Sequence, residues 1–238
     1  MNKKSLIIPA VTFLITFTIL FFVLLNSSDE DIKDSDVSIL FLGDFMIGDS
    51  YDDDLGIPFE NLKTLFEDKD DIIVNLETSI SDNEKPVFPD KTYTYNMKST
   101  VLEDLAGNNV TIFNLANNHI LDYGVDGFND TMQYLQNYDL SFFGAGLNET
   151  QARTGTIKTY KDSIDIGYLG YFEYRETYDN SYHFYANAGA PGVAKLNMTN
   201  LEEDILKLKE SADIVFVSLH IGKNYDINVS DETKKFAR

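Results

Sequence analysis

One segment of the chain reads Asn109-Val-Thr-Ile-Phe-Asn-Leu-Ala-Asn-Asn-His-Ile-Leu-Asp-Tyr-Gly124, and it combines a strand pattern with a polar cluster. Residues 110–115 are apolar and rich in β-branched and aromatic side chains, which is typical of a buried strand. A helical pattern follows Gly124. In open α/β sheets, polar groups between a buried strand and the next helix lie where ligands bind. Four residues of types that bind a cation or a phosphate lie there: Asn117, Asn118, His119 and Asp122.

The same cluster has an ordinary structural interpretation. Asn-Asn and Asp-x-Gly sequences form turns, because these residues tolerate left-handed backbone and hydrogen-bond their own main chain. A single histidine beside a turn is more often a packing residue than a ligand. Taken alone, the segment slightly favours the structural interpretation, and only similar endings of other strands change that balance.

The composition bounds the class of protein. The chain has 238 residues, no cysteine, and 39 acidic against 19 basic residues, which gives a net charge of −20. Its apolar content is enough for one sizeable core. The lack of cysteine excludes disulfides and thiolate metal sites. We expect no binding to nucleic acid, because that requires basic residues that displace counterions.

The amino-terminal residues have the pattern of a membrane anchor. Two lysines precede a charge-free, mostly apolar run at 6–25, about the length of a helix that spans a bilayer. No small-x-small cleavage site precedes Asn26, so we expect an uncleaved signal anchor with the lysines in the cytoplasm. The expected order is a cytoplasmic tail (1–5), a transmembrane helix (6–25), a linker (26–36) and an extracytoplasmic domain (37–238).

Strands and helices alternate in the expected extracytoplasmic domain. Apolar runs indicate strands at 37–42, 71–76, 110–115, 140–143 and 213–219, and a hairpin of 156–160 with 164–171 around Lys161-Asp162. Helices are expected at 57–66, from a capping box of Thr100 with Glu103, after Gly124, from Asn200 with Glu203, and from Ser230. The alternation predicts an α/β domain with a mixed, largely parallel sheet. The tyrosine-rich part between 168 and 185 is interpreted as an excursion packed on the core.

Four of the expected strands end in residues that can bind a metal: Asp44, Glu77, the pair Asn118-His119, and His220. In a parallel sheet these ends share one edge, so we expect the side chains to converge. Carboxylate, amide oxygen and imidazole together suit a divalent metal such as Mn, Zn or Fe, which binds phosphate oxygens and activates water. Beside it, an imidazole could protonate a leaving oxygen or stabilise charge on a phosphoryl group.

Each of these residues also has a structural alternative when judged alone. Asp44 is more readily a turn residue, and Glu77 is as readily a helix cap or a solvated side chain. His220 is slightly more readily a core histidine. Only their convergence at one edge favours the metal site over these alternatives.

The same residues, in the same order, resemble a known family. Five segments resemble the capsule synthesis protein CapA family in their order and rough spacing. They are Gly43-Asp44-Phe-Met, Asn75-Leu-Glu77, Ala116-Asn-Asn-His119 with Asp122 and Gly124, Gly144-Ala-Gly146 and His220-Ile-Gly222. This family includes the membrane-anchored component of bacterial poly-γ-glutamate synthesis, and it resembles the calcineurin-like metallophosphoesterases in fold. The resemblance covers roughly 37–238.

The resemblance implies a role for each residue of the constellation. It makes Asp44, Glu77, Asn118 and His220 metal ligands and His119 the catalytic, phosphate-facing histidine. Two departures stand out. Met46 replaces a histidine of many phosphoesterases, and the family continues to a Gly-x-His-x-His-type segment that completes the site. We therefore expect a fragment of a longer protein, with a domain incomplete at its C-terminus, or a truncated and inactive member.

The function that follows from the resemblance and the anchor is that of a membrane-anchored, extracytoplasmic component of poly-γ-glutamate capsule synthesis or export. Its expected partners are the membrane and other subunits of a polymer synthesis complex. Two alternatives stay open: a metal-dependent phosphoesterase at the cell surface, and a non-catalytic scaffold on the same fold. A domain this acidic repels a polyanion, so any grip on one would need a metal or a local basic patch.

Overall fold

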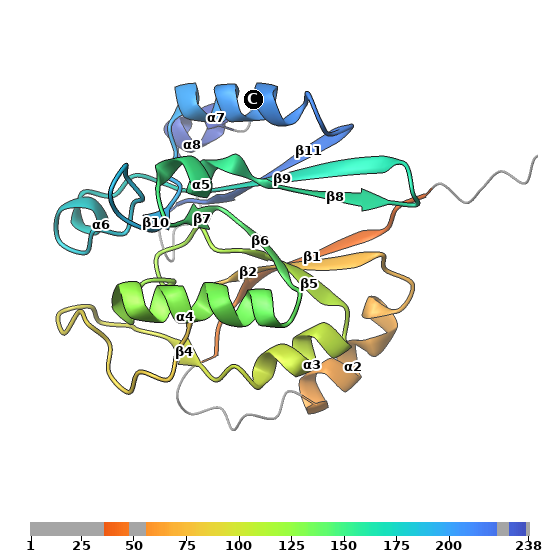
Figure 1. Cartoon of the computed structure of the whole chain (residues 1–238), viewed down its shortest axis with the longest axis horizontal. Helices are drawn as coiled ribbons and strands as arrows, with labels where there is room; N and C mark the ends of the chain where they lie inside the picture. Colours follow the sequence, from red (N-terminus) through yellow and green to blue (C-terminus); the bar gives the residue numbers. More distant parts are fainter. Residues whose placement is uncertain (1–35, 48–55, 223–228, 237–238) are drawn as a thin grey trace, which may run out of the picture. The chain divides into compact units, whose positions relative to one another are not determined.

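The first of two main sheets contains four parallel strands in the order β1-β2-β5-β6 (Figure 1). Its strands are β1 (Ile39–Phe45), β2 (Asp71–Leu76), β5 (Val110–Asn114) and β6 (Ser141–Phe143). β2 is buried along its whole length, as expected for an apolar, β-branched strand inside a parallel sheet. The four strands expected in this part of the chain are confirmed, with small shifts at their ends.

The computed structural model describes residues 36–47, 56–222 and 229–236, and all elements belong to one unit, Val37–Arg238. The expected cytoplasmic tail, transmembrane helix and nearly all of the linker lie outside the described residues. Within the part of the chain that the structure describes, no helix is long and apolar enough to cross a bilayer. The division into tail, anchor, linker and outer domain therefore stays a prediction.

The second main sheet has the order β11-β9-β8, with β8 (Thr156–Tyr160), β9 (Ile164–Phe172) and β11 (Ile214–His220). β11 runs parallel to β9, and β8 pairs with β9 as the expected antiparallel hairpin. Lys161 and Asp162 have positive φ angles of 50° and 63°, which are typical of tight hairpin turns. The α/β class with mostly parallel strands is confirmed, although the strands form two sheets instead of one.

Two short pairs complete the strands. β3 (Ser79–Ile80) pairs in parallel with β4 (Asn96–Met97), and β7 (Ala145–Gly146) pairs antiparallel with β10 (Gly192–Val193). β7 follows β6 directly at Gly144, whose φ is 84°. This break ends the first sheet, because the chain leaves the plane of β6 before β8 begins.

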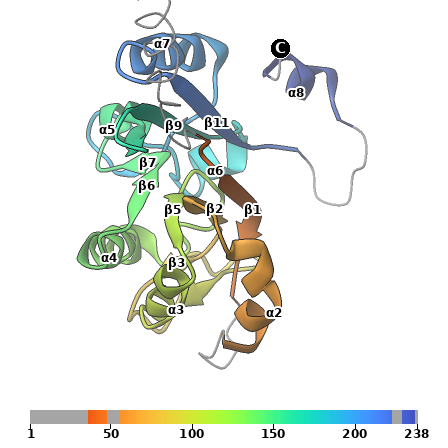
Figure 2. The same cartoon turned by 90° about the vertical axis from the view of Figure 1, so that its right-hand side faces the viewer.

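The two sheets pack face to face between outer layers of helices (Figures 1 and 2). Ile73, Ile112 and Phe143 of the first sheet form one buried cluster with side chains of β8 and β9, and the rings of Phe143 and Tyr168 stack with centroids 5.8 Å apart. Outside the first sheet lie α2 (Gly56–Phe66), α3 (Val101–Gly107) and α4 (Gly124–Asn137). Outside the second lie α5 (Glu149–Thr154) and α7 (Met198–Leu208). Two shorter helices are α6 (Glu176–Asn180) and α8 (Asp231–Phe236).

Two of the expected helix starts are wrong in detail. Thr100 has helical backbone angles and no side-chain hydrogen bond to the start of α3, so the predicted capping box does not form. α7 begins at Met198 instead of Asn200, because Oδ1 of Asn197 accepts a 2.8 Å hydrogen bond from the backbone N–H of Asn200. The start at Ser230 is confirmed: its hydroxyl accepts a 3.0 Å hydrogen bond from the backbone N–H of Thr233.

Candidate metal centre

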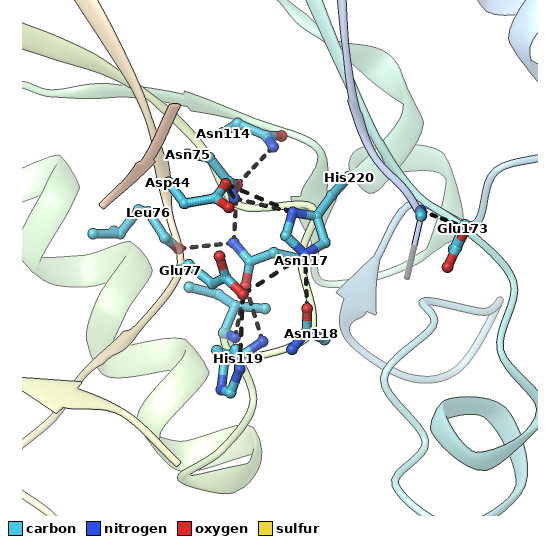
Figure 3. Close-up of polar contacts among 12 residues, drawn as sticks. Asp44, Asn75, Leu76, Glu77, Asn114, Asn117, Asn118, His119, Glu173 and His220 are labelled. Carbon is cyan, nitrogen blue, oxygen red and sulfur yellow. Dashed lines mark hydrogen bonds and ion pairs between the residues drawn. The ribbon is translucent and has the colours of Figure 1, made fainter. Parts of the chain in front are cut away.

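A row of hydrogen-bonded polar side chains lies at the carboxyl ends of β1, β2 and β5 (Figure 3). Asn75 is the register partner of both Asp44 in β1 and Asn114 in β5. Nδ2 of Asn75 donates to Oδ1 of Asp44 at 2.7 Å, and Nδ2 of Asn114 donates to Oδ1 of Asn75 at 2.8 Å. The row therefore holds the carboxylate of Asp44 against the neighbouring strand.

Asp44 reaches this row through an irregularity in β1. The register between β1 and β2 shifts between Phe41 and Asp44, and Gly43 has a φ of 81°, which glycine adopts without steric cost. Such a bulge bends the strand and redirects the side chains that follow it. Asp44 thus lies inside the strand, past the bulge, and not in a turn as its structural alternative proposed.

His220 joins the row from the second sheet. Its Nδ1 lies 3.2 Å from Nδ2 of Asn75, and its Nε2 lies 2.7 Å from Oδ1 of Asn118. Because an amide NH₂ only donates, Nδ1 accepts and the ring carries its proton on Nε2 in this metal-free arrangement, so a cation that binds either nitrogen would replace its contact with Asn75 or Asn118. The centre is therefore assembled from both sheets, with β11 supplying the histidine and the segment after β5 supplying the amide.

Asp44, Glu77 and His220 form a triad whose ligand atoms all lie within 4.8 Å of one another. Oε1 of Glu77 is 3.7 Å from Nε2 of His220, and Oδ1 of Asp44 is 3.8 Å from Nδ1. Among the described residues, the buried Oε2 of Glu77 has no hydrogen-bond partner. A buried carboxylate oxygen left in this way costs free energy unless a cation or donor meets it. Two carboxylates and an imidazole, beside an amide oxygen, are a donor set that fits a divalent cation.

The electrostatics of the site favour the uncharged forms of Glu77 and His220. Burial, and then the negative charge of Asp44, raise the pKa of Glu77 to about 8. Burial also lowers the pKa of His220. A divalent cation would reverse the balance at Glu77, because its own charge would then be the largest in the site.

His119 lies next to the triad with its ring in a fixed orientation. Nε2 is 3.7 Å from Oε1 of Glu77, and Nδ1 is 2.7 Å from Oδ2 of Asp122. The ring also packs against Tyr95, with centroids 4.5 Å apart. Burial lowers the pKa of His119, and the contact with Asp122 opposes that shift. With Nδ1 engaged, Nε2 is the nitrogen directed toward the triad.

Asn117, one of the four candidate ligand residues, instead holds the polar loop in place. It is fully buried, and its Nδ2 donates to the carbonyl of Leu76 at 2.8 Å. Its Oδ1 accepts from the backbone N–H groups of His119 at 3.0 Å and Ile120 at 3.1 Å. Asn117 therefore fixes the turn that presents Asn118 and His119, which is the role that the structural interpretation of this segment gives it.

Lys91 is a site residue that the sequence analysis missed. Its Nζ donates to the carbonyl of Asn118, forms an ion pair with Asp122, and lies 3.2 Å from Nδ1 of His119. The Lys91 side chain is only 6% exposed and that of Asp122 is fully buried. Burial lowers the pKa of Lys91, and Asp122 opposes that shift. Asp122 is thus a buried counter-ion and not a free ligand.

A cleft of about 780 Å³ opens over the triad. Besides the residues of the centre, its walls include Met46, Asp90, Thr92, Tyr93, Arg175 and Tyr178. The tyrosine-rich part of the chain, expected only to pack on the core, therefore also supplies one wall. Arg175 was not identified from sequence.

All five residues predicted for the site come together in the structure. Asp44, Glu77, Asn118, His119 and His220 are joined by the contacts described above, and Figure 3 shows them around one point. Which of them bind a metal, and whether His119 is catalytic, stay predictions.

Comparison with known proteins places this geometry in context. Residues 38–238 match the family described as "Bacterial capsule synthesis protein PGA_cap". The chain is 27% identical over 211 residues to the PGA biosynthesis protein CapA of Bacillus subtilis (strain 168), covering 87% of this chain and 54% of that protein. It is 29% identical over 157 residues to the capsule biosynthesis protein CapA of Bacillus anthracis, covering 63% of this chain and 36% of the relative.

A third relative is a probable polyglutamine synthesis accessory protein of Mycobacterium tuberculosis. It is 28% identical over 163 residues, which cover 64% of this chain and 41% of the relative. The chain thus spans about half the length, or less, of the relatives it matches.

Proposed function

Because this chain belongs to the bacterial capsule synthesis protein family PGA_cap, we propose that it acts in the synthesis or export of capsular poly-γ-glutamate. The names of its relatives, which are a PGA biosynthesis protein, a capsule biosynthesis protein and a probable polyglutamine synthesis accessory protein, support this proposal. We place the protein at the cell membrane, anchored by the apolar run 6–25, with the described domain outside and other subunits of a synthesis complex as its partners.

The triad with its unpartnered carboxylate oxygen is the observation that carries the proposal of a metal-dependent site. Asp44, Glu77 and His220 would hold a divalent cation, with Asn118 beside them as an amide donor. Such a cation supplies Lewis-acid polarisation of a bound phosphoryl or carboxyl oxygen. It also offsets the repulsion between a polyanion and an acidic protein.

His119 has the geometry of a group that acts on an oxyanion bound at this centre. Its Nδ1 is held by Asp122 at 2.7 Å, so the ring cannot turn away without losing a buried contact. Its Nε2 then faces the ligand. In the imidazolium form, which Asp122 favours against burial, Nε2 would donate a hydrogen bond to an oxygen of the ligand or pass its proton to a leaving oxygen. The proposed reaction class is phosphoester hydrolysis at the cell surface.

Met46 favours a second candidate, a non-catalytic binding or scaffold protein. This residue lines the cleft and is 42% exposed, yet it offers only a thioether where many phosphoesterases have a histidine. A site that lacks this histidine would still bind a cation through its other ligands. It would not have the complete set of ligands that those phosphoesterases use for hydrolysis. Metal binding is common to both candidates, whereas turnover belongs to the first alone.

Metal content and turnover of the purified full chain test these proposals. We expect one bound Mn, Zn or Fe in the wild type, and loss of that metal in Asp44→Ala and His220→Ala but not in His183→Ala, an exposed histidine outside the triad. Chelator-sensitive hydrolysis of a phosphodiester would support the enzyme, and metal without hydrolysis would support the scaffold. Equal metal content in all variants would refute the centre.

The capsule role has its own test in the producing cell. Deletion of the gene should abolish surface poly-γ-glutamate, and the wild-type gene should restore it. Restoration by Asp44→Ala at the wild-type level would show that the role does not need the metal centre.

A further inference from the structure

Arg175 places a fixed positive charge on the wall of the cleft. It follows β9 closely after Phe172, the register partner of His220, and its side chain is 33% exposed. Among the lining residues that the structure describes, the other fixed cation is Lys91, which is buried and paired with Asp122. Arg175 is therefore the lining cation that a ligand can reach.

The guanidinium of Arg175 is held on two edges and one face. Nε donates to Oε1 of Glu173 at 2.7 Å, and Nη2 donates to the carbonyl of Gly222 at 2.6 Å. The group also lies over the ring of Phe172, 5.4 Å from its centroid, and the same ring packs against His220 at 5.7 Å. The two bonds use Nε and Nη2 and do not involve Nη1. A cation fixed in this way loses little conformational entropy when it binds a ligand.

The cleft is larger than a single phosphate requires. Its volume of about 780 Å³ lies within the range of about 300–1,000 Å³ typical of pockets for larger small molecules. Glu173, which holds Arg175, lies on the far side of His220 from Glu77 and His119 (Figure 3). A ligand that fills the cleft therefore extends from the triad toward a separate positive charge.

We propose that Arg175 binds a second oxyanion of the ligand whose first oxyanion is held at the Asp44–Glu77–His220 centre. The inference rests on the proposed function, which puts an anionic ligand in the cleft. In a γ-linked glutamate chain the second oxyanion is an α-carboxylate, and in a phosphorylated ligand it is a second phosphate. A guanidinium binds both through the same charge-assisted hydrogen bonds.

A purely structural role for Arg175 makes a different prediction. Arg175 and Glu173 both bind Gly222, because Oε2 of Glu173 accepts a 3.0 Å hydrogen bond from its backbone N–H. If Arg175 only held the segment after β11, Glu173→Gln would weaken ligand binding as Arg175→Gln does. If Arg175 contacts the ligand, Glu173→Gln leaves binding intact or tighter. The amide oxygen of the glutamine still accepts from Nε of Arg175, while the bond to Gly222 and the competing negative charge are lost.

The test is calorimetric titration of the Mn²⁺-loaded full chain in detergent with inorganic phosphate, pyrophosphate and a γ-linked glutamate tetramer. Arg175→Gln should weaken the tetramer, pyrophosphate or both by about tenfold or more, and phosphate by less than about twofold. The ligand that loses affinity identifies the source of the second oxyanion. Lys195→Gln is the matched control: it removes one positive charge near Tyr174 and Tyr185, outside the cleft lining, and should change none of the affinities.

The outcomes separate this inference from the proposed function. Equal affinities of wild type and Arg175→Gln for all three probes would overturn the role of Arg175 while leaving the metal centre intact. Parallel losses in Arg175→Gln and Glu173→Gln would also overturn it in favour of the structural role. Failure of the wild type to bind Mn²⁺ or any of the probes would overturn the proposed function and this inference with it.

Discussion

Oδ1 of Asn118 lies 2.7 Å from Nε2 of His220, and this contact joins the two sheets at the candidate centre. Asn118 follows β5 in the first sheet, whereas His220 ends β11 in the second. The centre thus forms only when the sheets pack in their correct relative position. Changes in the core between the sheets should reach the site, although they touch no proposed ligand.

Gly170 in β9 gives the clearest case. A Cβ atom at this position would lie 2.1 Å from Oδ1 of Asn114 and 3.0 Å from the ring of Phe143. We predict that Gly170→Ala lowers the free energy of unfolding by about 1–3 kcal/mol, the usual cost of overpacking. It should also weaken Mn²⁺ binding, because Asn114 holds Asn75 and so Asp44. Urea unfolding and a Mn²⁺ titration measure the two effects.

Gly107→Ala is the matched control for this substitution. Nothing lies within 4 Å of a Cβ atom at Gly107, which ends α3, so its unfolding free energy and Mn²⁺ affinity should stay close to wild type. If Gly170→Ala behaved in the same way, the proposed link between sheet packing and the centre would be wrong.

Local patterns predicted the strands well but not their partners. Continuous apolar, β-branched runs mark β2 and β5, because each strand is buried inside a parallel sheet. Nothing in the sequence of β9 shows that it pairs with β11 instead of β6, because that choice depends on contacts between segments far apart. The start of α7 was misplaced for a local reason: Asn197 and Asn200 are both good capping residues, and the earlier one is used.

The predictability of the site follows the same division. Asp44, Glu77 and His220 were identifiable because each lies at the end of an apolar run, where parallel strands present their side chains. Lys91 comes from a segment without periodicity, and Arg175 from a tyrosine-rich part interpreted as packing. Their positions are set by contacts with residues distant in the sequence, Lys91 with Asp122 and Arg175 with Gly222, which no local pattern records.

The raised pKa of Glu77 predicts a pH dependence of stability in the metal-free protein. Its folded value of about 8 exceeds the ordinary value of 4.5, so the folded state binds the proton more tightly than the unfolded state. The stabilisation is complete below about pH 4.5 and is lost as the pH rises toward 8. Relative to Glu77→Gln, the wild type should lose at most about 1.4 kcal/mol per pH unit in this window.

Metal binding provides the complementary measurement. A cation that binds the carboxylate of Glu77 must displace its proton, so Mn²⁺ binding below pH 8 should release a proton and tighten as the pH rises. Calorimetry in buffers of different ionisation enthalpy counts that proton. A pH-independent affinity with no proton release would show that Glu77 is already ionised in the metal-free protein.

The amino-terminal anchor predicts where the protein fractionates. Deletion of residues 6–25 should move the protein from the membrane to the soluble fraction, because the remaining sequence has no comparable apolar run. Deletion of residues 2–5 keeps that run and should leave the protein in the membrane. Immunoblots of the two fractions decide the matter, and a membrane-bound 6–25 deletion would contradict the anchor.

Substitution of Lys91 tests whether the buried ion pair between Lys91 and Asp122 organises the centre. Lys91→Met would leave the carboxylate of Asp122, which is fully buried, without its cation, so we expect a loss of about 3–5 kcal/mol in unfolding free energy. Lys195→Met removes a half-exposed lysine paired with Asp179 and should cost at most about 1 kcal/mol. Denaturant unfolding of both variants at pH 7 gives the comparison. Equal small losses of unfolding free energy in both variants would mean that the buried carboxylate of Asp122 does not need the charge of Lys91. Asp122 and Tyr95 alone would then orient His119.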